Sequence, residues 1–189
     1  MAAAGASLIV VGHRGLNPFS TFLMGSVSQG VAAHTPVPVV VVPTKFAVPA
    51  DAPVVVGVAP GAIAPVEFAF AEAELRGVPL EVVRAWMYPQ SFPGHISVPP
   101  ADEARRNAEE SAELERLLTP SWQAHPDVEV ITRIGLAIPE QALVDASPRA
   151  CLVVVGAHRK HSRFGLPIGR VPHRVLHLAQ APVAVIPHD

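Results

Sequence analysis

Four small residues near the start of the chain have the types and the spacing of a phosphate-binding loop. Gly12 and Gly15 are separated by two residues, and Gly25 and Ser26 follow after nine more. An apolar run precedes this segment, and a helical pattern over about residues 24–33 follows it. Glycine permits close approach of the backbone, so that N–H groups converge on a phosphate, and a helix N-terminus adds partial positive charge. We therefore treat these four residues as candidate phosphate ligands.

A second segment repeats this loop with two changes. Gly156 and Gly169 keep the first and third glycine of the pattern, but Arg159 replaces the second glycine and Arg170 replaces the serine. A Cβ in place of glycine costs about 1–2 kcal/mol where the backbone needs a left-handed turn. Arginine side chains, however, bind phosphates directly. These arginines belong to a basic cluster with two open interpretations: an anion site built from side chains, or solvated residues on a loop. The cluster comprises His158, Arg159, Lys160, His161, Arg163, Arg170 and Arg174.

The two loops belong to an internal repeat. Residues 8–43 and 152–187 align without a gap at an offset of 144, and eleven aligned positions are identical. Each repeat reads as an apolar run, a glycine-containing loop, a helix and a second apolar run that ends in proline. We interpret residues 1–43 as the last strand, helix and strand of one domain, residues 44–53 as a proline-containing linker, and residues 54–189 as a complete domain.

Strand and helix patterns alternate through the complete domain. Continuous apolar runs are typical of strands that are covered on both faces. Because crossover connections are right-handed, the pattern predicts an α/β fold: an open, doubly wound, five-stranded parallel sheet with helices on both faces, preceded by a partial β-α-β remnant. The expected strands are 7–12 and 39–42 in the remnant and 54–58, 80–86, 128–133, 152–155 and 183–186 in the domain; its expected helices are 64–76, 102–118, 139–146 and 168–179.

Two details of this prediction concern the ligand site and the longest helix. Ligands of such sheets bind beyond the carboxyl ends of the strands, so we expect the site at the loops after Val58 and Val155. The helix over residues 102–118 is expected to end before Pro120, which lacks an amide N–H. Its apolar side is expected to comprise Ala104, Ala108, Ala112 and residues 114–118, with Glu, Arg and Asn facing water.

The glycine spacing between a buried strand and a helix resembles the nucleotide-binding signature of the universal stress protein family. The strand opening at residues 54–58, the helix end at 75–80 and the closing run at 181–187 are also similar to that family, and the resemblance covers nearly the whole chain. It implies a Rossmann-like fold of the adenine nucleotide alpha hydrolase type, with ATP held in the glycine loop and helped by an aspartate after the first strand.

The same resemblance implies how the chain associates. The final strands of two domains pair antiparallel in that family, so residues 39–42 and 183–186 are expected to pair within this chain. The strand at residues 8–11 would then expose an apolar edge, and we expect either association with another chain, such as a homodimer, or poor order in residues 1–50.

The sequence departs from the family pattern at positions that would contact a bound nucleotide. Ala59, Pro60 and Gly61 stand where the family has Asp-Gly-Ser, and loss of a charged acceptor weakens binding by about 1.5–3 kcal/mol. The first repeat has the better loop, but the strand that would carry its aspartate is not in the sequence, so a relic turn without a ligand is the alternative interpretation of Gly12, Gly15 and Gly25. We therefore expect a noncatalytic stress-response or signalling module that acts through dimerisation and has degraded nucleotide binding; the alternative is an adenine-nucleotide-binding protein with slow or no ATP hydrolysis.

Charge and residue types limit which partners, metal sites and catalytic groups the sequence predicts. The net charge of −2 provides no basic surplus, so neither nucleic acid nor membrane is expected as a partner. Cys151 opens a strand, where a thiol is usually a core residue, and His173 and His177 lack a cysteine or carboxylate nearby to complete a metal site. No catalytic or metal-binding residue is predicted. The N-terminus has no basic residue or signal core, and a cytoplasmic location is expected.

Overall fold

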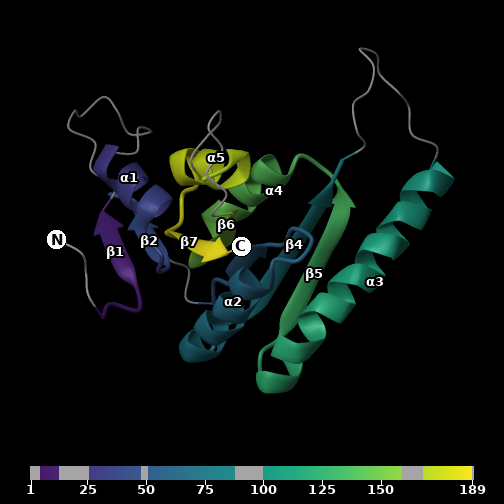
Figure 1. Cartoon of the computed structure of the whole chain (residues 1–189). Coiled ribbons are helices and arrows are strands. Elements are labelled where there is room, and N and C mark those ends of the chain that lie inside the picture. Colours follow the sequence, from purple (N-terminus) through teal and green to yellow (C-terminus); the bar gives the residue numbers. More distant parts are fainter. Residues whose placement is uncertain (1–4, 13–25, 48–50, 88–99, 159–167, 189) are drawn as a thin grey trace, which may run out of the picture.

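The computed structural model contains one seven-stranded sheet (Figure 1). It describes residues 5–12, 26–47, 51–87, 100–158 and 168–188. The strand order is β1-β2-β7-β6-β3-β4-β5. The strands are β1 (Ile9–Gly12), β2 (Val39–Val42), β3 (Val54–Gly57), β4 (Leu80–Trp86), β5 (Val130–Leu136), β6 (Leu152–His158) and β7 (Val183–His188). The helices are α1 (Ser26–His34), α2 (Ile63–Arg76), α3 (Pro100–Ala124), α4 (Pro139–Ala146) and α5 (Arg170–Leu178), with a short 3-10 helix η1 (Ser147–Arg149).

The five strands β3 to β7 form a continuous parallel unit. β3 lies at its centre, between β4 on one side and β6 on the other, and β5 and β7 lie outside them. The chain therefore runs outward through β4 and β5 and then returns to the opposite side of β3 through β6 and β7. This order confirms the open, doubly wound sheet that the sequence predicts.

The strands of the two repeats pair in the same register. In β1 and β2, Ile9 lies opposite Val39, and in β6 and β7, Val153 lies opposite Val183. The second pair is the first pair moved by the repeat offset of 144. The sequence repeat is thus also a structural repeat over these strands.

β2 and β7 join the repeats by antiparallel pairing, which confirms the expected docking of the two final strands within the chain. Val40 lies opposite Ala184, which is its own equivalent in the second repeat. A local pseudo-twofold axis therefore passes through this pair. The pairing leaves β1 and β5 as the two edges of the sheet.

Helices cover both faces of the unit formed by β3 to β7, and for this reason the valine runs of β3 and β6 are buried on both sides. Val153 packs with Leu143 of α4 and Val175 of α5 in one core cluster. Val154, the next residue along β6, packs with Phe70 of α2 in the other cluster. Figure 1 shows α4 and α5 on one side of the sheet and α2 and α3 on the other.

The end of α3 differs from the prediction. The helix continues through Pro120 to Ala124, so the expectation that Pro120 ends it is wrong. Pro120 is exposed, while Leu118 and Ser121 on either side of it are buried. A proline removes one backbone hydrogen bond, and burial of its neighbours holds the last turn in place despite that loss.

The buried face of α3 also differs. Ala104, Ala108 and Ala112 are exposed, although they were expected on the apolar side. Glu110 is buried instead, because the buried guanidinium of Arg84 on β4 lies beneath this part of the helix and binds its carboxylate. The face toward the sheet comprises Asn107, Glu110, Leu114, Leu118 and Ser121.

Several strand ends lie beyond their expected positions. β6 and β7 extend to His158 and His188, which lie opposite each other in parallel register. Pro187 lacks a backbone N–H, but β2 pairs only with Val183 to Val185 of β7. The proline therefore removes no hydrogen bond to β2 and is tolerated in the strand. β5 begins and ends later than expected because it pairs with β4 along that whole strand.

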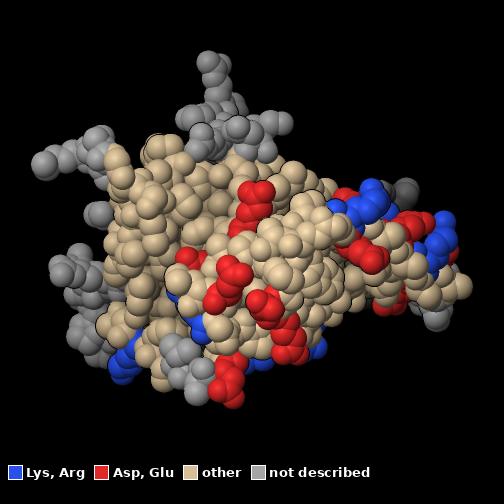
Figure 2. Space-filling view, turned by 90° about the horizontal axis from the view of Figure 1, so that it is seen from below, with Lys and Arg blue, Asp and Glu red and all other residues tan. Residues whose placement is uncertain are grey.

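Charges on the surface are mixed. On the face drawn in Figure 2, acidic and basic side chains of the described residues are interspersed, and no continuous basic patch forms. Within the described ranges, no helix combines the length and the apolar character needed to cross a membrane.

Candidate ligand-binding site

A cavity of about 600 Å³ lies beyond the carboxyl ends of β3, β4, β6 and β7. The loop before α2, the N-terminal half of α3, α4 and the start of α5 complete its wall. Val58 and Val155 both line it, so the cavity lies at the strand reversal between β3 and β6, where the sequence predicts a ligand site. Its volume lies in the range of small-molecule sites, roughly 300–1,000 Å³.

The floor of the cavity depends on a glycine at the end of β3. A Cβ on Gly57 would lie 2.6 Å from Cδ1 of Leu143 on α4. Both residues line the cavity. Glycine at this position therefore lets α4 pack directly against the end of β3.

The loop after β3 carries no ligand-binding carboxylate. Ala59 is exposed and lines the cavity. The loop is a tight turn, in which the amide of Ala62 donates to the carbonyl of Ala59 at 3.2 Å and Gly61 has a φ of +73°. The position where the family pattern has aspartate thus offers only a methyl group to a ligand.

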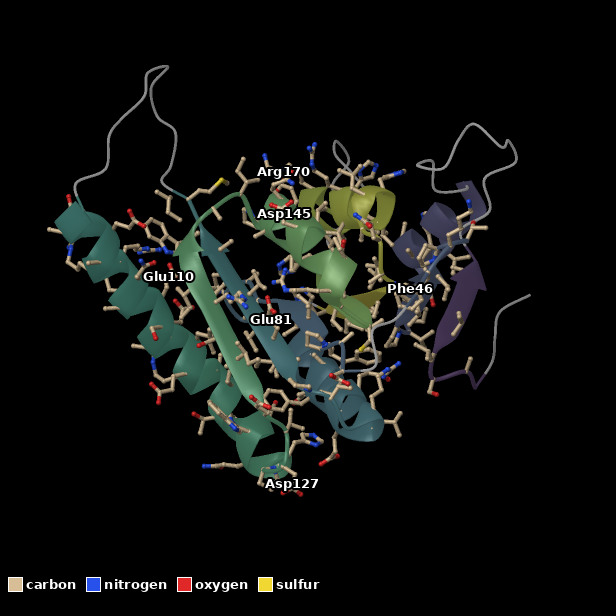
Figure 3. All side chains as sticks on the ribbon, turned by 180° about the vertical axis from the view of Figure 1, so that it is seen from behind. Phe46, Glu81, Glu110, Asp127, Asp145 and Arg170 are labelled. Atoms are coloured by element: carbon tan, nitrogen blue, oxygen red, sulfur yellow. The ribbon has the colours of Figure 1, made fainter. Side chains whose placement is uncertain are left out.

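A buried ion-pair network forms the part of the cavity wall that contacts the start of this loop. Nε of Arg84 donates to Oε2 of Glu110 at 2.7 Å, and Nη1 of Arg84 donates to the carbonyl of Val58 at 3.2 Å. The side chains of Arg84 and Glu110 are each 5% exposed. Nη2 of Arg106 lies 2.5 Å from Oε1 of Glu110. Figure 3 shows Glu110 between α3 and the sheet.

Sequence reasoning missed this network. Its signal was the charge of Arg84 inside the expected strand 80–86, because a charge in a buried strand needs a partner. Glu81, in the same strand, gave a second such signal. It is buried on the opposite face and pairs with Arg133 at 2.9 Å and Arg149 at 2.5 Å.

Gly156 lies at the cavity for a packing reason. A Cβ on this residue would lie 2.6 Å from Nε2 of His188 and 2.9 Å from Cγ of Pro65. The rings of His158 and His188 are tilted, with centroids 4.1 Å apart, and both line the cavity. The ends of β6 and β7 therefore each bring one imidazole to the cavity, next to Gly156.

The start of α5 forms the last part of the wall. Gly169 has a φ of +83°, a conformation that favours glycine, and it precedes the first helical residue, Arg170. Nε of Arg170 lies 3.1 Å from Oε1 of Glu140, a buried residue of α4. Figure 3 shows Arg170 at the α4–α5 side of the molecule.

The candidate phosphate ligands therefore divide into two places. Gly156, Gly169 and Arg170 line the cavity. Gly12 ends β1, which β2 and β7 separate from β6, and Ser26 begins α1. Among the described lining residues of the cavity, none belongs to β1 or β2 of the first repeat. Gly15, Gly25 and Arg159 lie outside the described residues, as do Lys160, His161 and Arg163 of the basic cluster.

Other reactive groups lie away from the cavity. Burial raises the pKa of the Cys151 thiol, which makes it a poor nucleophile at neutral pH. Burial and the neighbouring His177 lower the pKa of His173. Within the described ranges, no group of three or more His, Cys, Asp or Glu side chains is arranged to hold a metal ion.

An open doubly wound sheet with its cavity at the strand reversal defines the class of Rossmann-like α/β proteins. A family model described as "Universal stress protein family" matches residues 1–43 and 53–187. The chain belongs to the universal stress protein family.

Curated relatives agree with this assignment. A universal stress protein from Mycobacterium tuberculosis is 36% identical in an alignment 192 residues long. The alignment covers 97% of this chain and 60% of that protein. One from Mycolicibacterium smegmatis is 33% identical over 190 residues, covering 98% of this chain and 63% of that protein. The chain therefore spans less than two thirds of the length of these relatives.

Solved structures show the same fold. A putative universal stress protein from Pseudomonas aeruginosa is 19% identical, with a TM-score of 0.66, over 98% of this chain and 64% of that chain. A universal stress protein in complex with cAMP is 21% identical, with a TM-score of 0.53, over 74% of this chain and 99% of that chain.

Proposed function

We propose that this chain is a noncatalytic stress-response or signalling module of its family, whose cavity binds adenine nucleotides only weakly. The observation that carries this proposal is the make-up of the cavity. It has the place and the volume of a nucleotide site, but Ala59 supplies no acceptor for ribose hydroxyls. A hydrogen bond to a charged acceptor contributes about 1.5–3 kcal/mol, so its absence weakens binding by roughly ten- to a hundredfold or more.

The carboxylate in the cavity wall is poorly suited to catalysis. Among the described lining residues, Glu110 is the one carboxylate, and its two oxygens are engaged by Arg84 and Arg106. A general base must reach the proton that it abstracts and must be able to accept it. Because both oxygens of Glu110 already bind guanidinium groups, neither is free to approach a substrate proton, and this supports a noncatalytic role.

The organisation of the chain forms part of the same proposal. Residues 1–43 would be the closing part of one universal stress domain, residues 44–53 a linker, and residues 54–189 a complete domain. The identical strand registers of the two repeats support this division. We further propose that the module functions as a homodimer. Because β2 and β7 already pair with each other, the open edge at β1 is the surface we assign to that contact.

An adenine-nucleotide-binding protein with slow ATP hydrolysis is the second candidate. The cavity volume of about 600 Å³ favours it, because this space is large enough for a nucleotide. The cAMP complex of a universal stress protein with the same fold makes an adenine nucleotide the first ligand to test.

Calorimetric titration of ATP separates the two candidates. For the wild type we expect a dissociation constant in the millimolar range, roughly −4 kcal/mol, and no release of phosphate. Ala59→Asp restores a charged acceptor at an exposed cavity position, and should tighten ATP binding about tenfold or more.

Ala104→Asp is the matched control, since it adds the same charge at an exposed position of α3 that is not part of the cavity wall. It should leave ATP affinity unchanged within about twofold. Micromolar ATP binding by the wild type with turnover would instead establish the second candidate.

A further inference from the structure

The α5 side of the cavity entrance holds an ion pair between two helices. Glu140 is the second residue of α4, and Arg170 is the first residue of α5. Nε of Arg170 lies 3.1 Å from Oε1 of Glu140. The two side chains differ in their surroundings, because that of Glu140 is 7% exposed and that of Arg170 is 64% exposed. The pair therefore joins a solvated cation to a buried anion.

The buried partner depends on this contact. Oε2 of Glu140 is buried and has no hydrogen-bond partner among the described residues. Removing one partner of a buried ion pair is strongly unfavourable, because it leaves an uncompensated charge. Arg170 would be hydrated after separation, but Glu140 would remain in the protein interior. The cost of opening the pair thus falls mainly on Glu140.

Among the described residues, Arg170 is also the arginine best placed for an anion at this end of the cavity. It lines the cavity together with Gly169 and Val171, at the N-terminus of α5. Arg84 and Arg106, the other lining arginines of the described chain, are engaged by Glu110 on the α3 side. An incoming phosphate at α5 would therefore compete with Glu140 for Arg170.

We propose that Glu140 is a specificity-determining residue, because its ion pair with Arg170 competes with phosphate for the guanidinium and so weakens the binding of phosphate-bearing ligands. We call this ion pair the latch. To bind a phosphate, Arg170 must either leave Glu140 buried without a partner or bring the phosphate close to the carboxylate. Both outcomes are electrostatically unfavourable. This inference rests on the proposed function, because it explains weak nucleotide binding through a contact separate from Ala59.

The first test measures binding of inorganic pyrophosphate to the full chain by calorimetry. Glu140→Gln keeps the shape of the side chain but removes its charge, and should tighten pyrophosphate binding about five- to tenfold. The control Asp145→Asn removes the same charge from an exposed position of the same helix and should change affinity less than twofold. Glu140→Gln combined with Arg170→Ala should lose the gain. The latch is overturned if Glu140→Gln binds no more tightly than Asp145→Asn, or if the double variant keeps the gain.

The second test measures the contact itself by thermal unfolding, without any ligand. Arg170→Ala should lower the melting temperature by several degrees, because it leaves Glu140 unpaired, and adding Glu140→Gln should restore most of that loss. Additive effects of the two substitutions would overturn the latch. The proposed function is tested separately, by ATP titration of the wild type and Ala59→Asp. A negative result for the latch therefore does not decide the proposed function, and a negative result for the proposed function does not decide the latch.

Discussion

Two glycines at equivalent positions of the repeat show how surroundings decide the role of a residue. A Cβ on Gly156 would meet Nε2 of His188 at 2.6 Å and Cγ of Pro65 at 2.9 Å. A Cβ on Gly12 would meet no described atom within 4 Å. Both glycines were candidate phosphate ligands. In the second repeat, the same residue type is required by the packing of the cavity wall.

This contrast predicts unequal effects of the same substitution. Gly156→Ala should lower the free energy of unfolding by about 1–3 kcal/mol, because overpacking forces neighbouring groups to shift. Gly12→Ala, the matched control, should change it by no more than about 0.5 kcal/mol. Urea denaturation of both variants measures the difference. Equal stability of the two variants would show that His188 and Pro65 move away at no cost.

The residues that sequence reasoning found and missed differ in a physical way. Gly156, Gly169 and Arg170, which line the cavity, could be named as candidates because the repeat fixes their spacing along the chain. The pairs of Arg84 with Glu110 and of Arg170 with Glu140 were missed. Each pair joins residues 26 or 30 positions apart, so only the tertiary fold brings them into contact. Local patterns carry no information on such partners.

At the scale of helices and strands, local signals were sufficient where they agreed with burial. Gly77 ends α2 in a left-handed conformation with a φ of +63°, as expected for glycine after a helix. The valine runs of β3 and β6 likewise marked strands covered on both faces. The prediction failed in α3, where burial of Glu110 and Leu118 overrode both the alanine pattern and Pro120. Propensity is a weak guide once tertiary contacts oppose it.

The edge strand β1 lacks the cover that its equivalent has. Val10 is 63% exposed, whereas Val154, at the same position of the second repeat, is 0% exposed. Val154 lies in a core cluster with residues of α2 and beside β3. β1 has no such neighbours on its open side within the described chain. An uncovered apolar edge of this kind favours association.

Val10→Lys should therefore weaken self-association of the full chain at least about tenfold. Burial of the valine side chain in a dimer contact would contribute about 1.5–3 kcal/mol, and the substitution replaces that side chain with a charge. Size-exclusion chromatography with light scattering over a range of concentrations measures this change. Ile131→Lys is the control, since Ile131 is 38% exposed on the opposite edge strand, β5. A wild type that stays monomeric at every concentration would exclude β1 as a dimer contact.

At the scale of the whole molecule, the repeat explains both the shape of the sheet and the location of its cavity. The pseudo-twofold axis between β2 and β7 relates two strand pairs of identical register. Only the second of these pairs is followed in the sheet by the β3, β4 and β5 strands. The cavity needs the end of β3 beside the end of β6, so it forms in the second repeat. The described strands of the first repeat, β1 and β2, are therefore separated from this cavity's β3 and β6 by β7.

Mapping ATP on the full chain by amide NMR tests this account most directly. If the cavity at β3 and β6 is the nucleotide site, millimolar ATP should shift the amide signals of Ala59, Gly169 and Arg170, and leave those of Gly12 and α1 unchanged. Shifts confined to Gly12 and α1, with the cavity signals unmoved, would contradict the account and assign nucleotide binding to the first repeat.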